Sequence, residues 1–281
     1  MTCSAWSTSA WGPSPKTCIS ASPVYPSGSS KVRALFSFFT LLPSGRGATL
    51  EEAARGAYLL PLVGILTGLP GAVLLLAGVF PPGVAASLAL SAALLAAGLH
   101  HTDGVLDVGD ALMVRGTPSR RREVLKDARI GVGGLGALFA VYAPTLFALG
   151  ALADASPALA GVSLLAAEVA ARSAMLLVLV FGTPAAEGSS SAYFVRALKG
   201  RTRRTAAVAL ALALPPLVAL PLGWGTLAVI IAVPAVALGS LRLSGAAFGG
   251  ISGDVSGATG ELTRTVLLVA LSAVVPAVHA A

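Results

Sequence analysis

Long apolar runs separated by short polar segments make up the chain from residue 57 to the C-terminus. A helix needs roughly 17–25 apolar residues to cross the hydrocarbon core of a bilayer. Seven runs come near or within that range, at residues 57–79, 83–99, 132–153, 157–181, 205–222, 224–241 and 265–280. The pattern predicts an all-α, polytopic transmembrane helical bundle of about seven spans.

The chain ahead of these runs divides into two parts. Residues 1–31 are rich in Ser, Pro and Thr without an apolar run, which predicts a disordered N-terminal extension because such a composition cannot bury a core. Residues 32–43 are apolar but too few to cross about 30 Å of hydrocarbon, so we expect an interfacial or re-entrant helix there. Residues 32–281 then form a single membrane-embedded domain.

Composition and charge agree with a membrane protein and orient it. Only 11% of the residues are charged and the mean hydropathy is +0.85, whereas soluble domains carry roughly 25% charged residues. In this topology, all 19 Lys and Arg residues except Arg172 lie on the same side of the membrane as the N-terminus. Because basic residues concentrate in cytoplasmic loops, we expect a cytoplasmic N-terminus in the cell (plasma or inner) membrane. The same rule explains the net charge of +7 without a nucleic-acid partner.

Three aspartates follow the second predicted span, at Asp103, Asp107 and Asp110. Spacings of four and three residues place them within about 60° on one helical face. Like charges on one face repel, and a divalent cation offsets that repulsion. Oxygen ligands without Cys favour Mg²⁺ or Mn²⁺ over Zn²⁺, so we predict a metal site; the alternative is a solvated acidic helix end.

Two histidines precede this cluster. His100 at the membrane boundary is typical of an interfacial residue. His101 lies two residues before Asp103 and therefore off the aspartate face of a regular helix. A role for His101 at the site requires a local break in the helix, which Gly104 permits.

A basic loop follows the aspartates, with Arg115, Arg120, Arg121, Arg122, Lys126 and Arg129. A metal with guanidinium and ammonium donors binds and neutralises a diphosphate, so we expect two or three of these side chains to contact substrate and the others to set topology. Asp127 is either a further metal ligand or a salt-bridge partner. The glycines that begin the third predicted span form either a phosphate-binding turn or a close-packing surface: Gly131, Gly133, Gly134 and Gly136.

Two further charged sites carry open alternatives. Asp254 lies among Gly, Ser and Thr in the last connection, which we expect to be a loop that brings this acid to the metal site or else is a flexible linker. Glu168 and Arg172 stand four residues apart within a predicted span, where charges are costly. They form a structural ion pair, or Arg172 reaches towards a substrate phosphate.

At these residues the sequence resembles the adenosylcobinamide-GDP ribazoletransferase family, also called cobalamin-5′-phosphate synthases. The resemblance runs from about Val32 to the C-terminus, with Ile251-Ser252 in place of the expected Val-Thr. Four motifs carry it in order: His101-Thr102-Asp103-Gly104 with Asp107 and Asp110; Lys126-Asp127-Ala128-Arg129-Ile130-Gly131 with Gly133; Arg172; and Gly253-Asp254-Val255.

The resemblance implies a catalytic domain and a reaction. A hydroxyl of α-ribazole or its 5′-phosphate attacks the diphosphate of adenosylcobinamide-GDP, GMP leaves, and adenosylcobalamin or its 5′-phosphate forms, with Mg²⁺ as the metal. The residues expected to act are Asp103, Asp107 and Asp110 as metal ligands, Lys126, Arg129, Arg122 and Arg172 as substrate-binding residues, and Asp127, Asp254 and His101 in catalysis.

Two other classes compete with this interpretation. A CDP-alcohol-type lipid phosphotransferase also places spaced aspartates on membrane helices, but its pattern needs Ala-Arg soon after the first Asp-Gly, where this chain has Val105-Leu106. A membrane transporter requires charges inside several spans, and the predicted spans contain only Glu168 and Arg172. The number of subunits stays open, and a homo-oligomer is compatible with the sequence.

Overall fold

The computed structural model describes residues 31–41 and 49–279, with side chains described up to residue 274. The predicted disorder of the N-terminal extension falls on residues 1–30, outside the described residues. The described chain is helical, with one isolated parallel bridge between Pro184 and Ile251. The elements are α1 (Lys31–Phe39), α2 (Leu50–Arg55), η1 (Ala57–Leu59), α3 (Leu60–Leu76), α4 (Pro82–Ala96), α5 (His100–Met113), α6 (Pro118–Val124), α7 (Val132–Ala155), α8 (Pro157–Phe181), α9 (Ser190–Ala197), α10 (Arg201–Ala219), η2 (Leu220–Leu222), α11 (Gly225–Phe248) and α12 (Gly253–His279).

Five helical segments of the described chain are long and apolar enough to cross a membrane. They are α3 with η1, α7, α8, α10 with η2, and α11. A sixth results if α4 and α5 form one span broken by a bend of 94°. The multi-pass helical class is therefore confirmed, whereas the number of seven and the cytoplasmic N-terminus remain predictions.

Helix α8 forms the centre of the bundle. Every residue from 166 to 179 is buried, and α8 packs against α3, α10, α11 and α12. Small residues allow the closest of these contacts, since a β-carbon on Gly64 of α3 would lie 2.6 Å from the carbonyl oxygen of Glu168. At its start, Ser156 accepts a hydrogen bond from the Leu159 amide and Pro157 occupies the first turn, so that α8 turns back sharply from α7.

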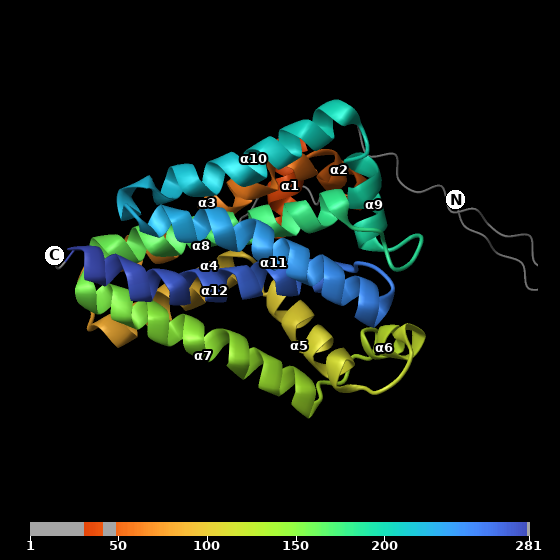
Figure 1. The fold of residues 1–281 in the computed structure, drawn as a ribbon, viewed down its shortest axis with the longest axis horizontal. Helices are drawn as coiled ribbons and strands as arrows, with labels where there is room; N and C mark the ends of the chain where they lie inside the picture. The colour runs from red at the N-terminus through yellow and green to blue at the C-terminus, as the bar shows by residue number, and fades with distance from the viewer. Residues whose placement is uncertain (1–30, 42–48, 280–281) are drawn as a thin grey trace, which may run out of the picture.

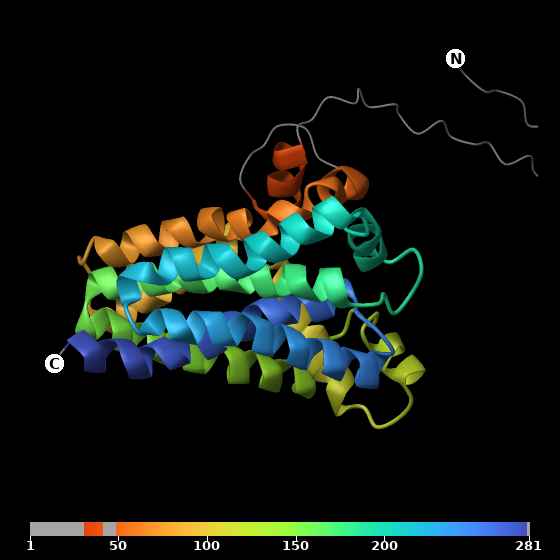
Figure 2. The ribbon, with the colours of Figure 1, turned by 45° about the horizontal axis from the view of Figure 1, so that its top comes forward.

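The two ends of the bundle differ in chemistry (Figures 1 and 2). The short helices α6 and α9, the start of α10 and the connection from α11 to α12 gather at one end, together with the basic residues of those segments. The turn between α10 and α11 and the last turns of α12 lie at the other end. We call the first end the basic end.

Candidate active site

The aspartate helix α5 begins at a break in the backbone. Gly98 and Leu99 both have positive φ, +77° and +61°, and Leu99 is a residue that rarely adopts this conformation. The break turns α5 by 94° from α4, so that α5 runs from the middle of the bundle towards the basic end. The helix then continues regularly through Gly104, so the local break that a role for His101 requires lies before His100 and not at Gly104.

A pocket of about 530 Å³ opens beside the start of α5. Its polar wall contains His100, His101 and Asp103 from α5, and Asp254 and Ser256 from α12. Its apolar wall contains Phe38 and Phe39 from α1 and Phe194 from α9. The structure thus brings together two sequence motifs that lie about 150 residues apart in the chain.

Close packing of glycines brings α12 against α5. A β-carbon on Gly104 would lie 2.6 Å from the Asp254 carbonyl oxygen, and one on Gly257 would lie 3.1 Å from the α-carbon of His101. The prediction of a loop around Asp254 is wrong, because α12 begins at Gly253 and Asp254 lies in its first turn. Glycine weakens a helix on its own, but here it allows a backbone contact that tertiary packing stabilises.

The carboxylates near this pocket act on one another electrostatically. Asp107 is partly desolvated, and the negative charges of Asp103, Asp254 and Asp110 all act on it. Burial raises the pKa of Asp254 above its ordinary value, and the charge of Asp103 raises it further while a hydrogen bond from Ser252 opposes the change. Among the described residues, neither Lys nor Arg forms an ion pair with Asp103, Asp107 or Asp254. The site therefore carries unbalanced negative charge.

The metal site predicted for Asp103, Asp107 and Asp110 is not assembled as a set of ligands. In the described part of the chain, no three acidic, His or Cys side chains converge closely enough to hold an ion. Both oxygens of Asp110 are engaged elsewhere, since they accept hydrogen bonds from the amides of Gly131 (2.7 Å) and Gly134 (2.8 Å). Asp110 caps the N-terminus of α7, where unpaired amides attract a negative charge.

The glycines at the start of α7 form a close-packing surface. A β-carbon on Gly133 would lie 2.9 Å from the Gly109 carbonyl oxygen, and one on Gly109 would lie 2.5 Å from the Ala137 side chain. Gly136 has open space around it. Of the two alternatives for this segment, the structure supports packing of α7 on α5.

The basic loop lies apart from the pocket. Asp127 is a salt-bridge partner of Arg129, whose Nη2 lies 2.7 Å from it, and hydrogen bonds from Arg129 lower the pKa of Asp127 to about 2. Arg122 donates to the Phe248 carbonyl oxygen at 2.7 Å. None of the predicted substrate-binding residues, Lys126, Arg129, Arg122 and Arg172, lines the pocket that contains Asp103 and Asp254.

Arg172 belongs to a buried ionic network behind the pocket. Its Nη2 lies 3.3 Å from Glu168, which also accepts hydrogen bonds from Thr67 (2.8 Å) and Arg264. Arg264 pairs in addition with Glu261, so two carboxylates and two guanidiniums share the interior. The ion-pair interpretation of Glu168 and Arg172 is supported, although Nε and Nη1 of Arg172 have no partner among the described residues.

This network corrects the sequence interpretation of Arg264. We expected Arg264 in a connection ahead of a span at 265–280, but it is 1% exposed in α12. The hydropathy pattern fails here because four mutually paired charges are tolerated inside the bundle, where a single charge is not.

The same network reaches the pocket wall. Tyr142 donates to Glu261 at 2.8 Å and pairs with Thr102 of α5 at 2.8 Å. His101 is buried beside it, and its Nδ1 lies 4.0 Å from Glu261 without a hydrogen-bond partner in the described part of the chain. The helix that carries Asp103 is therefore anchored to the ionic network through Thr102, the residue before this aspartate.

Comparison with known proteins agrees with these motifs. Residues 31–272 match the family model described as cobalamin-5-phosphate synthase. The chain belongs to this family. The match covers α1 and most of α12 as well as the aspartate motif, so the resemblance noted from the sequence is confirmed over nearly the whole described chain.

Relatives of the family cover most of this chain. The protein of Halorubrum lacusprofundi named adenosylcobinamide-GDP ribazoletransferase is 37% identical over 254 residues, covering 84% of this chain and 94% of the relative. A protein of the same name from Methanocella arvoryzae is 34% identical over 260 residues, covering 86% and 95%. One from Methanosarcina barkeri is 30% identical over 251 residues, covering 84% and 89%. No solved structure matches the chain.

The aromatic wall of the pocket was not anticipated from the sequence. The rings of Phe38 and Phe39 lie 5.8 and 5.7 Å from that of Phe194, and Phe39 lies 6.2 Å from His101. Three of the four residues 36–39 are Phe, in a chain with only 6% aromatic residues. This concentration was the sequence signal that could have indicated an aromatic binding surface. Its partner Phe194 lies in a segment to which we had assigned no role.

Proposed function

We propose that this cobalamin-5-phosphate synthase family member transfers the adenosylcobinamide phosphate group from adenosylcobinamide-GDP to α-ribazole or α-ribazole 5′-phosphate. A ribose hydroxyl oxygen forms a bond to the phosphorus next to the cobinamide, the bond from that phosphorus to the GMP oxygen breaks, and the hydroxyl proton passes to a base. GMP and adenosylcobalamin or its 5′-phosphate are the products. The observation that carries the proposal is the pocket that unites Asp103 and Asp254 within the family match.

Asp254 is the better candidate for the base that accepts the hydroxyl proton. It stands in the pocket, and its pKa is raised by burial and by Asp103, which favours proton acceptance near neutral pH. Asp127 lies outside the pocket, and the hydrogen bonds from Arg129 keep its pKa low. His101 lines the same wall, and its buried Nδ1 lies 4.0 Å from Glu261 behind the pocket, so its role is to support the wall on which the hydroxyl binds.

The donors present suit Mg²⁺. Asp103 and Asp107 offer carboxylate oxygens, which are the ligands that Mg²⁺ prefers, and their mutual repulsion lacks a cationic partner among the described residues. Side-chain rotations would have to bring their oxygens to one point. When bound, Mg²⁺ supplies positive charge to the diphosphate oxygens. Asp110 is a weaker ligand candidate because both of its oxygens accept amide hydrogens.

The aromatic and basic groups suit the organic and phosphate parts of the substrates. Phe38, Phe39 and Phe194 offer ring faces on which a planar base packs. Lys126 and Arg129 stand on the connection that follows α6 at the basic end, where they can meet a GMP phosphate on its way out. Arg172, enclosed in the ionic network, acts instead by anchoring the pocket floor.

The reaction is tested with purified protein, adenosylcobinamide-GDP, α-ribazole and Mg²⁺, with GMP release followed by liquid chromatography. We expect equimolar GMP and corrinoid product from wild type and a loss of about 100-fold or more in Asp254→Asn, since a general base contributes 10²–10⁴-fold. Release of GMP without a joined corrinoid product would make the protein a hydrolase, and no release at all would remove the proposal.

We propose further that the basic end faces the cytoplasm from the plasma or inner membrane. The support is the concentration of Lys and Arg in connections at that end. With Cys3 and Cys18 replaced by Ser, single cysteines at Arg203 and Gly223 are labelled in intact cells with a membrane-impermeant maleimide. Labelling at position 223 and protection at position 203 is expected; the reverse pattern would invert the topology.

A further inference from the structure

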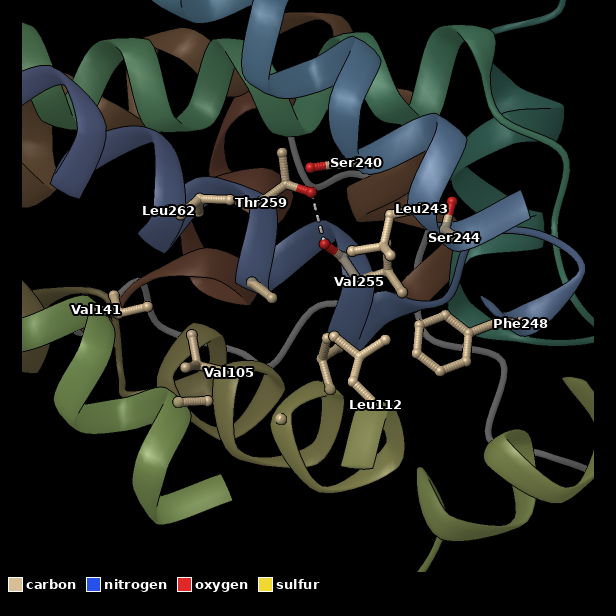
Figure 3. A pocket seen from close by; sticks show the side chains of 14 residues that line it. Val105, Leu112, Val141, Ser240, Leu243, Ser244, Phe248, Val255, Thr259 and Leu262 are labelled. Atoms are coloured by element: carbon tan, nitrogen blue, oxygen red, sulfur yellow. Dashed lines mark hydrogen bonds between the residues drawn. The ribbon is translucent and has the colours of Figure 1, made fainter. Parts of the chain in front are cut away.

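A second cavity, of about 160 Å³, lies between α5, α7, α11 and α12 (Figure 3). Val105 and Leu112 of α5, Val141 of α7, Leu243 and Phe248 of α11, and Val255 and Leu262 of α12 point into it. This cavity shares α5 and α12 with the active-site pocket but none of its lining residues. No part of the proposed reaction uses it.

The lining of this cavity is mostly apolar and disfavours water and polar ligands. Of its three hydroxyl groups, that of Thr259 donates to the Val255 carbonyl oxygen at 2.7 Å and that of Ser244 to the Leu241 carbonyl oxygen at 3.1 Å. A buried water needs two to four polar partners, and these walls leave few free. The cavity is much larger than the roughly 10–15 Å³ that one water requires, so an apolar occupant is favoured.

The cavity opens between helices that are apolar enough to cross a membrane. Helices α7 and α11 are both long and apolar enough to cross a membrane, and only 22% of the most apolar window of each is buried in the bundle. Leu243 and Leu262 line the cavity and are 48% and 42% exposed. The chemistry that fills such an opening at membrane depth is an alkyl chain.

One end of the cavity adjoins positive charge. Phe248, the last residue of α11, lines the cavity, and its carbonyl oxygen accepts a hydrogen bond from Arg122 of α6 at 2.7 Å. Arg120 and Arg121 stand on the same short helix. Basic side chains at a membrane surface attract anionic headgroups, so the alkyl occupant is expected to carry a negative head.

We propose that an acyl chain of an anionic phospholipid occupies this cavity, with its phosphate beside the guanidinium groups of α6. The chain packs on Val105 of α5 and Val255 of α12, which lie outside the set of residues that line the pocket with Asp103 and Asp254. The lipid thereby supports the spacing of the two helices that carry the carboxylates. This binding site stands independently of the proposed reaction.

Lipid retention tests the proposal. Delipidated full-length protein in detergent is mixed with equal amounts of phosphatidylglycerol and phosphatidylcholine of identical chains, repurified, and the retained lipid is measured by mass spectrometry. Wild type is expected to retain phosphatidylglycerol selectively. Ala258→Phe, which fills the cavity, should reduce retention about tenfold, the loss that two unburied methylene groups produce. Val141→Phe fills the cavity from α7 and is used if Ala258→Phe does not fold.

Two matched controls complete the test. Ala209→Phe adds the same ring to an exposed position of α10 and should retain lipid as wild type does. Replacing Arg120, Arg121 and Arg122 by Gln should abolish the preference for phosphatidylglycerol, whereas the same change at Arg201, Arg203 and Arg204 should preserve it. Equal retention by Ala258→Phe and Ala209→Phe would overturn the cavity site, and equal retention of both lipids by wild type would overturn the anionic headgroup.

Discussion

Gly104 of α5 packs on the backbone of Asp254 in α12 so closely that a β-carbon at position 104 would lie 2.6 Å from the Asp254 carbonyl oxygen. Real β-carbons do not approach an oxygen that closely, so the two helices can meet in this way only with glycine at this position. Asp103 is the residue before Gly104, and Asp254 provides the backbone on which Gly104 packs. The contact therefore sets the distance between the two aspartates.

Gly104→Ala is therefore expected to push α5 and α12 apart. Overpacking of this kind costs about 1–3 kcal/mol of folding stability. The displacement of the two carboxylates should also lower the rate of GMP release by the protein that remains folded. Gly136→Ala is the matched control, because Gly136 is an α7 residue with nothing near its missing β-carbon, and it should be neutral or stabilising by up to about 1 kcal/mol. Full activity in Gly104→Ala would contradict the assigned packing.

Asp254→Asn should stabilise the protein while it removes activity. The folded-state pKa of Asp254 is raised above the unfolded value, so ionisation of this carboxyl disfavours the folded state. The gain from Asn is therefore absent below the unfolded value near pH 4, grows as pH rises through the folded pKa, and is complete above it. Thermal melting of both proteins across this range in metal-free detergent buffer measures the difference; a gain that shrinks with rising pH would show the opposite shift.

Asp103 and Asp127 should differ sharply on neutralisation. Asp103→Asn and Asp107→Asn remove charge beside the pocket and should lower GMP release by about 100-fold, together with its dependence on Mg²⁺. Asp127→Asn removes only an exposed salt bridge with Arg129. Because exposed pairs contribute little, the rate of GMP release should fall by less than about fivefold. Comparable losses in Asp103→Asn and Asp127→Asn would give Asp127 a direct part in the reaction and contradict its assignment as a salt-bridge partner only.

Asp110→Ala should behave as the loss of a helix cap. Two amide hydrogen bonds to the start of α7 disappear, and such caps contribute about 0.5–2 kcal/mol. Reduced thermal stability is expected, with the Mg²⁺ concentration for half-maximal activity close to that of wild type. If instead the Mg²⁺ requirement rose as in Asp103→Asn while stability stayed constant, Asp110 would be a ligand.

Arg264→Leu should be the most destabilising of these changes. It leaves Glu168 and Glu261 buried without their shared partner, and breaking a buried ion pair in this way costs about 3–5 kcal/mol. Arg120→Leu provides the comparison, since its pair with Glu123 is exposed and contributes at most about 1 kcal/mol. Unfolding in increasing concentrations of denaturing detergent measures both, and similar midpoints would mean that the network is not formed.

Several features of this protein were determined by the sequence alone. The helical membrane class follows from the shortage of charged residues and the length of the apolar runs, because a bilayer admits few backbone arrangements. The family follows from motifs whose residue types and order are local properties of the chain. Asp103 was identified from sequence because it shares a helical face with two other aspartates, and Asp254 as an acid among Gly, Ser and Thr; the pocket contains both.

The tertiary structure decided which of the candidates act together. Asp103, Asp107 and Asp110 share one helical face, yet Asp110 turns to the amides of α7, because an adjacent helix N-terminus satisfies its oxygens. Arg264 and Glu261 resemble residues of a polar connection until Glu168 and Tyr142, from two other helices, are found beside them. Spacing along one helix predicts which side chains share a face, but partners come from helices distant in sequence, and the partners determine what each charge does.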